Sequence, residues 1–249
     1  MRSAFLDGLG VKAVIFDVDG VLVETMSLHY ESYRQILEPE GLRVEPIDIN
    51  RREGLGTPAV LASLSEEKGW GLSPERIEQM VARRRNLFLE NYEHRVYPHV
   101  PELLAWLEQA GYRLGVVSGA SERSLDVCLR EHPAAPDGRC LADWFPIIIS
   151  GSDMARGKPH PDPYLAALTK LSLEGRQALV VENAPLGIEA AHAAGCYAVA
   201  IETTCRNPTW KRPTGSCRIM PRCSGCWSAE GADSLLLSPP TCNYCSRGT

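Results

Sequence analysis

Two aspartates, Asp17 and Asp19, are the residues with the clearest chemical potential in this chain. They follow the apolar residues Val11, Ala13, Val14, Ile15 and Phe16, three of which are β-branched, and Gly20 comes directly after them. Such a run without polar alternation is typical of a strand buried on both faces of a parallel sheet. One carboxylate can attack phosphorus to form an aspartyl-phosphate, and a nearby one can act as general acid and base. The pair therefore predicts phosphoryl transfer at the carboxyl edge of a sheet, where ligands bind in open α/β folds.

Three further groups stand at expected strand ends or loops. Ser118 and Gly119 follow a strand over 112–117, Glu182 and Asn183 follow one over 178–181, and Lys158 lies in a loop after a strand over 145–149. Each alone has an ordinary alternative. Ser118 and Gly119 could form a strand-end turn, Glu182 and Asn183 a polar helix cap, and Lys158 could be a solvated surface lysine. Because parallel strands present their carboxyl ends on one edge, we expect these groups to surround one crevice.

The acids favour Mg2+ over calcium as a bound cation. A calcium-binding loop needs further acids and a glutamate at its twelfth position. Counting from Asp17, the fifth position is Val21 and the twelfth is Leu28, so the calcium alternative fails. Carboxylates combined with backbone and water oxygens suit Mg2+, which takes few protein ligands.

The elements that must position these residues indicate an α/β protein. Strands and helices alternate after residue 96, which predicts a five-stranded, doubly wound parallel sheet. Residues 25–95 have helical periodicity throughout and predict an inserted all-helical domain. We therefore expect an α/β core over 11–24 and 96–204, a helical cap over 25–95, and a separate tail over 205–249.

Composition excludes several classes of function. The 249 residues carry a net charge of −5, which argues against a general nucleic-acid binder. No apolar run approaches the roughly 20 residues of a membrane helix, and the N-terminus does not resemble a secretory signal. We expect a cytoplasmic monomer with reduced thiols, no membrane or nucleic-acid partner, and a small phosphorylated metabolite as substrate.

Four segments resemble the motifs of the haloacid dehalogenase (HAD) superfamily, in family order. They are 17–22 (DVDGVL), 116–119 (VVSG), 157–163 (GKPHPDP) and 180–188 (VVENAPLGI). The helical insertion after the first motif resembles the cap of the β-phosphoglucomutase and phosphoglycolate phosphatase subgroup. The resemblance covers roughly residues 11–204 and implies a HAD-like Rossmannoid core with that cap.

The resemblance implies a role for each matching residue. Asp17 would be the nucleophile and a Mg2+ ligand, and Asp19 the general acid/base that also gives its carbonyl oxygen to the metal. Glu182 and Asn183 would complete the metal site. Ser118, Gly119 and Lys158 would bind the phosphate. Glu24 and His29 would be associated with the substrate or the cap.

The sequence departs from the family pattern at three positions. Asn183 stands where many relatives have a second acid, which should weaken Mg2+ binding or alter a water contact. Glu24 stands where many have aspartate. Thr57 occupies the place of a mutase arginine for the distal phosphate, although Arg51 and Arg52 lie nearby. The leading hypothesis is a Mg2+-dependent phosphatase acting through an aspartyl-phosphate, and the alternative is a sugar phosphomutase.

The tail differs in composition from the rest of the chain. It holds six of the nine cysteines, six basic residues and two acidic ones. Its spacing C-x2-C-x15-C-x2-C fits a tetrahedral zinc site formed by Cys223, Cys226, Cys242 and Cys245. Two alternatives stay open: an aberrant C-terminus, or an inactive HAD domain whose tail binds zinc or a partner.

Overall fold

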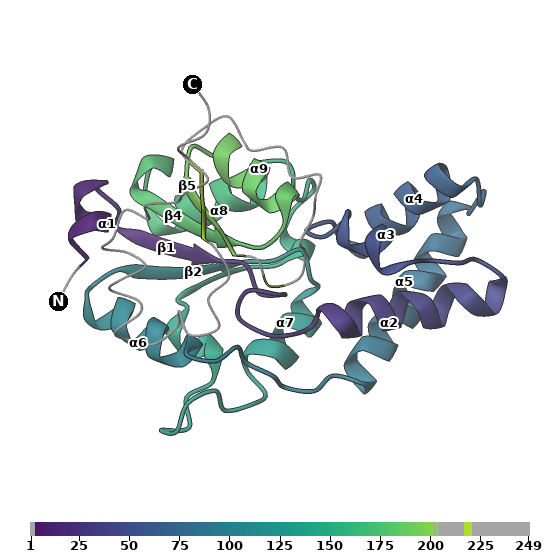
Figure 1. Ribbon diagram of the computed structural model, residues 1–249, viewed down its shortest axis with the longest axis horizontal. Helices are drawn as coiled ribbons and strands as arrows, with labels where there is room; N and C mark the ends of the chain where they lie inside the picture. The colour runs from purple at the N-terminus through teal and green to yellow at the C-terminus, as the bar shows by residue number, and fades with distance from the viewer. Residues whose placement is uncertain (1–2, 202, 204–216, 221–249) are drawn as a thin grey trace.

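The computed structural model of this protein describes residues 3–201, 203 and 217–220. Its centre is a parallel sheet with strand order β3-β2-β1-β4-β5-β6 (Figure 1). The strands are β1 (Ala13–Phe16), β2 (Arg113–Val117), β3 (Ile147–Ile149), β4 (Ala178–Glu182), β5 (Tyr197–Ile201) and β6 (Cys217–Met220). The predicted doubly wound sheet is confirmed, with one strand more than the five expected, because β6 pairs in parallel with β5.

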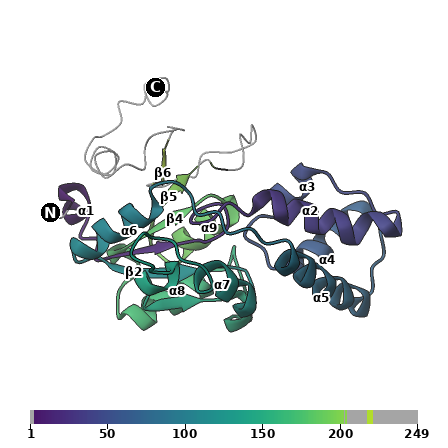
Figure 2. The same ribbon diagram turned by 90° about the horizontal axis from the view of Figure 1, so that it is seen from below.

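Helices cover both faces of the sheet (Figures 1 and 2). One face packs against α1 (Ala4–Gly8), α6 (Val100–Gln109) and α7 (Glu122–Leu129), and the other against α8 (Asp162–Leu171) and α9 (Pro185–Ala193). Alternate residues of β1 divide between the two layers: Val14 and Phe16 join the first, Ala13 and Ile15 the second. Burial on both faces explains why this strand is apolar throughout.

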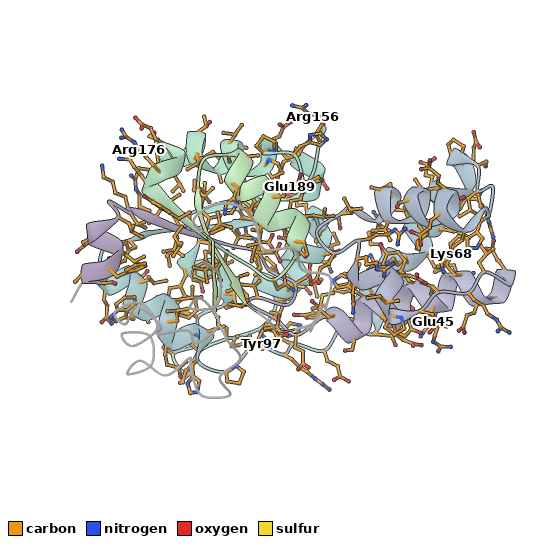
Figure 3. The ribbon with its side chains drawn as sticks, turned by 45° about the horizontal axis from the view of Figure 1, so that its top comes forward. Glu45, Lys68, Tyr97, Arg156, Arg176 and Glu189 are labelled. Carbon is orange, nitrogen blue, oxygen red and sulfur yellow. The ribbon has the colours of Figure 1, made fainter. Side chains whose placement is uncertain are left out.

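The inserted segment forms four helices that extend away from the sheet (Figure 1). They are α2 (Met26–Leu37), α3 (Pro46–Asn50), α4 (Thr57–Lys68) and α5 (Pro74–Glu90), and they enclose their own apolar cluster around Ile36, Leu61 and Leu64. Figure 3 shows Glu45 and Lys68 on this part, where Lys68 pairs with Asp48 at 2.9 Å. We call residues 25–95 the cap.

Helix starts in the cap follow the local sequence. The Ser73 hydroxyl accepts a hydrogen bond from the backbone N–H of Arg76, and Pro74 occupies the first turn of α5, where no N–H is needed. Helix α4 also has a proline, Pro58, in its first turn, and its N-cap is Gly56. Helices α1 and α3 were not predicted, because five residues are too few to show helical periodicity.

A tight turn follows β1 and aims the chain toward the cap. Gly20 has a φ of +77°, and the N–H groups of Val21 and Leu22 donate to the carbonyl of Val18. A residue with a Cβ would be strained in this left-handed conformation. The segment then pairs with the segment that returns from the cap through Val23 and Val96, so the cap is joined to the core by two adjacent segments.

The described residues also include four 3-10 helices: η1 (Glu38–Glu40), η2 (Leu141–Trp144), η3 (Gly151–Asp153) and η4 (Gly175–Gln177).

Candidate active site

The strand-end residues converge because their strands are neighbours. Strand β1 lies between β2 and β4, with Phe16 in register with Val116 on one side and Val181 on the other. The polar side chains at these three strand ends line the same pocket: Asp17, Ser118, Glu182 and Asn183. The sequence-based expectation that they share one sheet edge agrees with this geometry.

Lys158 lies under the pocket as a buried counter-ion. Its ammonium donates to Oδ1 of Asp17 at 2.6 Å, to Oε1 of Glu182 at 2.5 Å and to the carbonyl of Val117 at 3.2 Å, and the residue is only 3% exposed. Burial alone lowers the pKa of a lysine, but the carboxylates of Asp17 and Glu182 hold the pKa of Lys158 well above its usual value. The side chain is therefore positively charged.

The Asp17 carboxyl group is buried next to one lysine and two other acids. Burial raises the pKa of Asp17 to about 8; Lys158 opposes this effect, while Glu182 and Asp19 add to it. The carboxylate is thus costly to ionise in a site without a further cation. This electrostatic situation favours binding of a positive ion beside Asp17.

The Glu182 carboxylate accepts hydrogen bonds on both oxygens. Oε1 binds Lys158 and the hydroxyl of Tyr164 (3.0 Å), and Oε2 accepts from the N–H groups of Asn183 (3.0 Å) and Ala184 (3.1 Å). The residue is fully buried. In this arrangement Glu182 holds Lys158 in place, and its predicted role as a metal ligand stays a prediction. The sequence reasoning missed Tyr164, whose hydroxyl lies among the apolar residues of α8 that face the core.

Replacing Gly187 with alanine should displace the Glu182 carboxylate. An added Cβ would lie 1.8 Å from Oε1 of Glu182, too close for any side chain to occupy. We expect the free energy of unfolding to fall by about 3 kcal/mol, measured by urea denaturation. Gly8→Ala is the matched control, because nothing lies within 4 Å of that added Cβ. A Gly187→Ala protein as stable as wild type would contradict the described position of Glu182.

Asp19 is held by two donors from the start of the cap. Its Oδ1 accepts from the hydroxyl of Thr25 at 2.6 Å and lies 2.9 Å from Nε2 of His29. Burial raises the pKa of Asp19, but His29, Thr25 and the nearby Arg84 outweigh it and hold the pKa below its usual value. The ionised carboxylate is therefore the favoured form in this arrangement.

His29 connects Asp19 to helix α5. The Arg84 guanidinium contacts Nδ1 of His29 and donates to the hydroxyl of Thr57 at 2.8 Å. Because arginine can only donate, Nδ1 must accept, which leaves the proton of the neutral ring on Nε2, facing Asp19. Phe88 stacks on the histidine ring at 4.9 Å. Arg84 and Thr25 were not singled out from the sequence, since only the docking of α2 and α5 brings them to the site.

The predicted phosphate-binding and cap residues divide into two groups. Ser118 and Gly119 line the pocket, and the Ser118 hydroxyl accepts from the N–H of Ala120 at 3.0 Å. His29 lines it as well. Glu24 does not: it is exposed, and its backbone N–H donates to the carbonyl of Arg95. The structure therefore does not bring Glu24 to the site.

The pocket has a volume of about 320 Å³ and lies between the core and the cap. The cap packs directly on the core loop that follows β2, since a Cβ on Gly119 would lie 3.1 Å from the carbonyl oxygen of Gly54. On the opposite side, Nδ2 of Asn183 donates to Oε1 of Glu53 in the cap. Glu53 was not identified from the sequence either.

The donor groups beside Asp17 fit Mg2+. This cation prefers oxygen ligands, takes few of them from protein and keeps several waters. Asp17 provides a carboxylate oxygen besides the one that binds Lys158, and Asn183 provides an amide oxygen. Gly20 allows the close packing, because a Cβ there would lie 2.1 Å from Nδ2 of Asn183. Within the described part of the chain, no three His, Cys, Asp or Glu residues gather as a metal-binding group.

The proposed zinc ligands of the tail, Cys223, Cys226, Cys242 and Cys245, lie outside the described residues. Cys128, Cys140 and Cys196 are described and are free thiols. Among the described helices, none has the length and apolar character needed to cross a membrane.

The chain is similar to known proteins along most of its length. A family model described as "haloacid dehalogenase-like hydrolase" matches residues 11–195. A phosphoglycolate phosphatase of Rhodospirillum rubrum is 31% identical over 199 residues, which cover 76% of this chain and 79% of the relative. A β-phosphoglucomutase of Bacillus subtilis is 28% identical over 200 residues, covering 77% and 83%, respectively.

A solved structure shows the same fold. The β-phosphoglucomutase of Clostridium difficile has a TM-score of 0.67 to this chain at 21% identity, and the match covers 77% of this chain and 84% of the other.

Proposed function

Because this chain belongs to the haloacid dehalogenase-like hydrolase family, we propose that it is a Mg2+-dependent phosphatase of a small phosphorylated metabolite. One observation carries the proposal: Asp17, held by Lys158, and Asp19, held by His29 and Thr25, line one pocket that the cap covers. A buried nucleophile next to a second, separately positioned carboxylate is what a two-step phosphoryl transfer requires.

The first step transfers the phosphoryl group to Asp17. A carboxylate oxygen attacks phosphorus, and the ester P–O bond breaks. Asp19 gives a proton to the leaving alkoxide from its protonated form, which is the minor form because its pKa is lowered. In the second step, ionised Asp19 takes a proton from water, which attacks phosphorus. The aspartyl P–O bond breaks, and inorganic phosphate and the Asp17 carboxylate result. Asp19 thus alternates between acid and base.

The surrounding residues stabilise the charge on the transferring group. Ser118 and the N–H of Gly119 would bind its oxygens, and preorganised donors of this kind are most effective where water is excluded. The ammonium of Lys158, which contacts Asp17 and Glu182, would add positive charge beside the phosphoryl group. Asp17, the Asp19 carbonyl, Asn183 and Glu182 would hold Mg2+, which supplies neutralisation of the phosphoryl charge when bound.

The substrate would be a small phosphate ester. A pocket of about 320 Å³ suits a short sugar phosphate or a phosphorylated hydroxy acid. The similarity to a phosphoglycolate phosphatase at 31% identity supports this class. The expectations of a cytoplasmic location and a monomeric state rest on the sequence alone.

A sugar phosphomutase is the second candidate. The similarity to the β-phosphoglucomutase of Bacillus subtilis favours it. Against it, position 57 carries a threonine, whose hydroxyl accepts from Arg84, where the mutase resemblance would place an arginine. A mutase would interconvert hexose phosphates in the presence of a bisphosphate primer, whereas a phosphatase would release inorganic phosphate.

Removal of the metal tests the proposal. We expect the protein to release phosphate from at least one member of a panel of sugar phosphates, phosphoglycolate and an aryl phosphate. Turnover should disappear in excess EDTA and return with Mg2+ but not with Ca2+, whose larger size and irregular coordination do not suit the site. Turnover that persists after complete chelation would contradict the Mg2+ requirement, and no turnover on any ester would favour an inactive HAD domain.

A further inference from the structure

Glu53 reaches from the cap to the metal side of the active site. It lies in the turn between α3 and α4 and is half-buried. Its Oε1 accepts a hydrogen bond from Nδ2 of Asn183, and both residues line the pocket that contains Asp17. A carboxylate of the cap is therefore in direct contact with a residue that the proposed function assigns to Mg2+.

The turn that carries Glu53 is fixed on both sides. The preceding residue, Arg52, is buried and donates to the hydroxyl of Ser63 and the carbonyl of Asp48, both at 2.9 Å, and it also pairs with Glu67. The following residue, Gly54, adopts a φ of +92°. The position of Glu53 is thus set by its neighbours and does not depend on a flexible loop.

The same turn packs on the core loop that follows Asn183. A Cβ on Gly54 would lie 3.6 Å from the Cβ of Leu186 and 3.7 Å from that of Ala184. These are ordinary van der Waals distances, so the two backbones are in close contact. The contact between Glu53 and Asn183 is therefore part of a wider cap-to-core interface.

Asn183 is neutral, whereas the affinity of a Mg2+ site depends strongly on the number of carboxylates near it. We propose that Glu53 provides the negative charge that Asn183 does not, so that the core and the cap bind Mg2+ together. This inference rests on the proposed Mg2+-dependent function. Glu53 acts either directly on the cation or by orienting the Asn183 amide, whose NH2 group it binds.

A metal site shared in this way couples cation binding to cap closure. Mg2+ would stabilise the arrangement in which Glu53 contacts Asn183, and by thermodynamic reciprocity closure would strengthen Mg2+ binding. The cation would then bind more tightly to the closed protein than to any form with the cap displaced.

Mg2+ affinity of the substrate-free, full-length protein tests this inference, measured by isothermal titration calorimetry. Glu53→Gln should weaken Mg2+ binding roughly tenfold. This is the loss of metal affinity expected when a residue that hydrogen-bonds a metal ligand is replaced. Glu66→Gln removes the same charge from an exposed cap position and should leave the affinity unchanged. In the double variant Glu53→Gln/Asn183→Asp, one carboxylate is moved from the cap to the core, and the affinity should return close to that of wild type.

Hydrogen exchange gives a second readout that does not depend on turnover. Mg2+ should slow amide exchange over residues 51–57 in wild type, and much less in Glu53→Gln. Glutamine is nearly equal to glutamate in size and keeps an acceptor for Asn183, so folding should be preserved, which circular dichroism checks.

Three results are decisive. If Glu53→Gln binds Mg2+ as tightly as wild type, or if the double variant stays as weak as the single one, the inference is wrong while the proposed phosphatase activity stands. If wild type itself binds no Mg2+ and needs none for turnover, the proposed function fails, and this inference fails with it.

Discussion

Replacing Asp17 with asparagine is expected to lower phosphatase turnover by at least about 10³-fold, because the amide cannot act as the nucleophile that accepts the phosphoryl group. Asparagine keeps nearly the same shape and an oxygen that can accept from Lys158. Its introduction also removes one of the buried acids that crowd the site. Stability should therefore be preserved or increased, and activity alone should be lost. Steady-state phosphate release, together with thermal unfolding, measures both effects.

A surface aspartate provides the matched control. Asp126 pairs with Arg130 at 2.9 Å on the exposed face of α7, with its side chain 40% exposed. Asp126→Asn makes the same chemical change at a distance from the pocket and should leave turnover and stability near those of wild type. An Asp17→Asn protein that is folded and retains wild-type turnover would overturn the assignment of the nucleophile.

Replacing Lys158 with methionine is expected to cause the largest loss of stability, roughly 3–5 kcal/mol, because it leaves two buried carboxylates without their counter-ion. Lys158 touches both Asp17 and Glu182, and its side chain is 1% exposed. Urea unfolding followed by circular dichroism measures the change. Adding Glu182→Gln to this variant should restore part of the lost stability, since one of the two unpaired charges is then removed.

The control for this prediction is an exposed lysine. Lys12 precedes β1 and is exposed, so Lys12→Met should change the free energy of unfolding by no more than about 0.5 kcal/mol. If Lys158→Met unfolds at the same urea concentration as wild type, Lys158 is not the buried counter-ion described above.

The sequence was most informative where backbone topology alone determines position. Asp17, Ser118 and Glu182 could be placed together because each follows an apolar strand, and parallel strands end on one edge. The resemblance to the haloacid dehalogenase superfamily is confirmed, as is the predicted type of sheet. These inferences needed no knowledge of how any helix docks.

The residues that were missed depend on tertiary packing. Tyr164 reaches the site from α8 of the core and Arg84 from α5 of the cap. Glu53 reaches it from the turn between α3 and α4. Helical periodicity shows which face of a helix is apolar, but not which polar residue at its margin faces a site on another element. Glu24 illustrates the converse case, since its place next to the first motif suggested a role that its exposed position does not support.

Lys158 makes contacts that the sequence did not predict. The sequence placed it near the phosphoryl group, whereas the structure shows an ammonium held between two carboxylates. Spacing along the chain cannot show that contact, because Lys158 lies 141 residues from Asp17 and 24 from Glu182. The strand β6 was missed for a related reason: its four residues lie in a segment whose composition differs from that of the core.

The stereochemical course at phosphorus tests the central claim most directly. Hydrolysis of a phosphorothioate ester made chiral at phosphorus with two oxygen isotopes, carried out in water enriched in the third isotope, distinguishes one displacement at phosphorus from two. Transfer to Asp17 and then to water comprises two in-line displacements, each of which inverts the configuration. We expect net retention of configuration in the released thiophosphate. Net inversion would mean that water attacks the substrate directly, and it would contradict the aspartyl-phosphate mechanism.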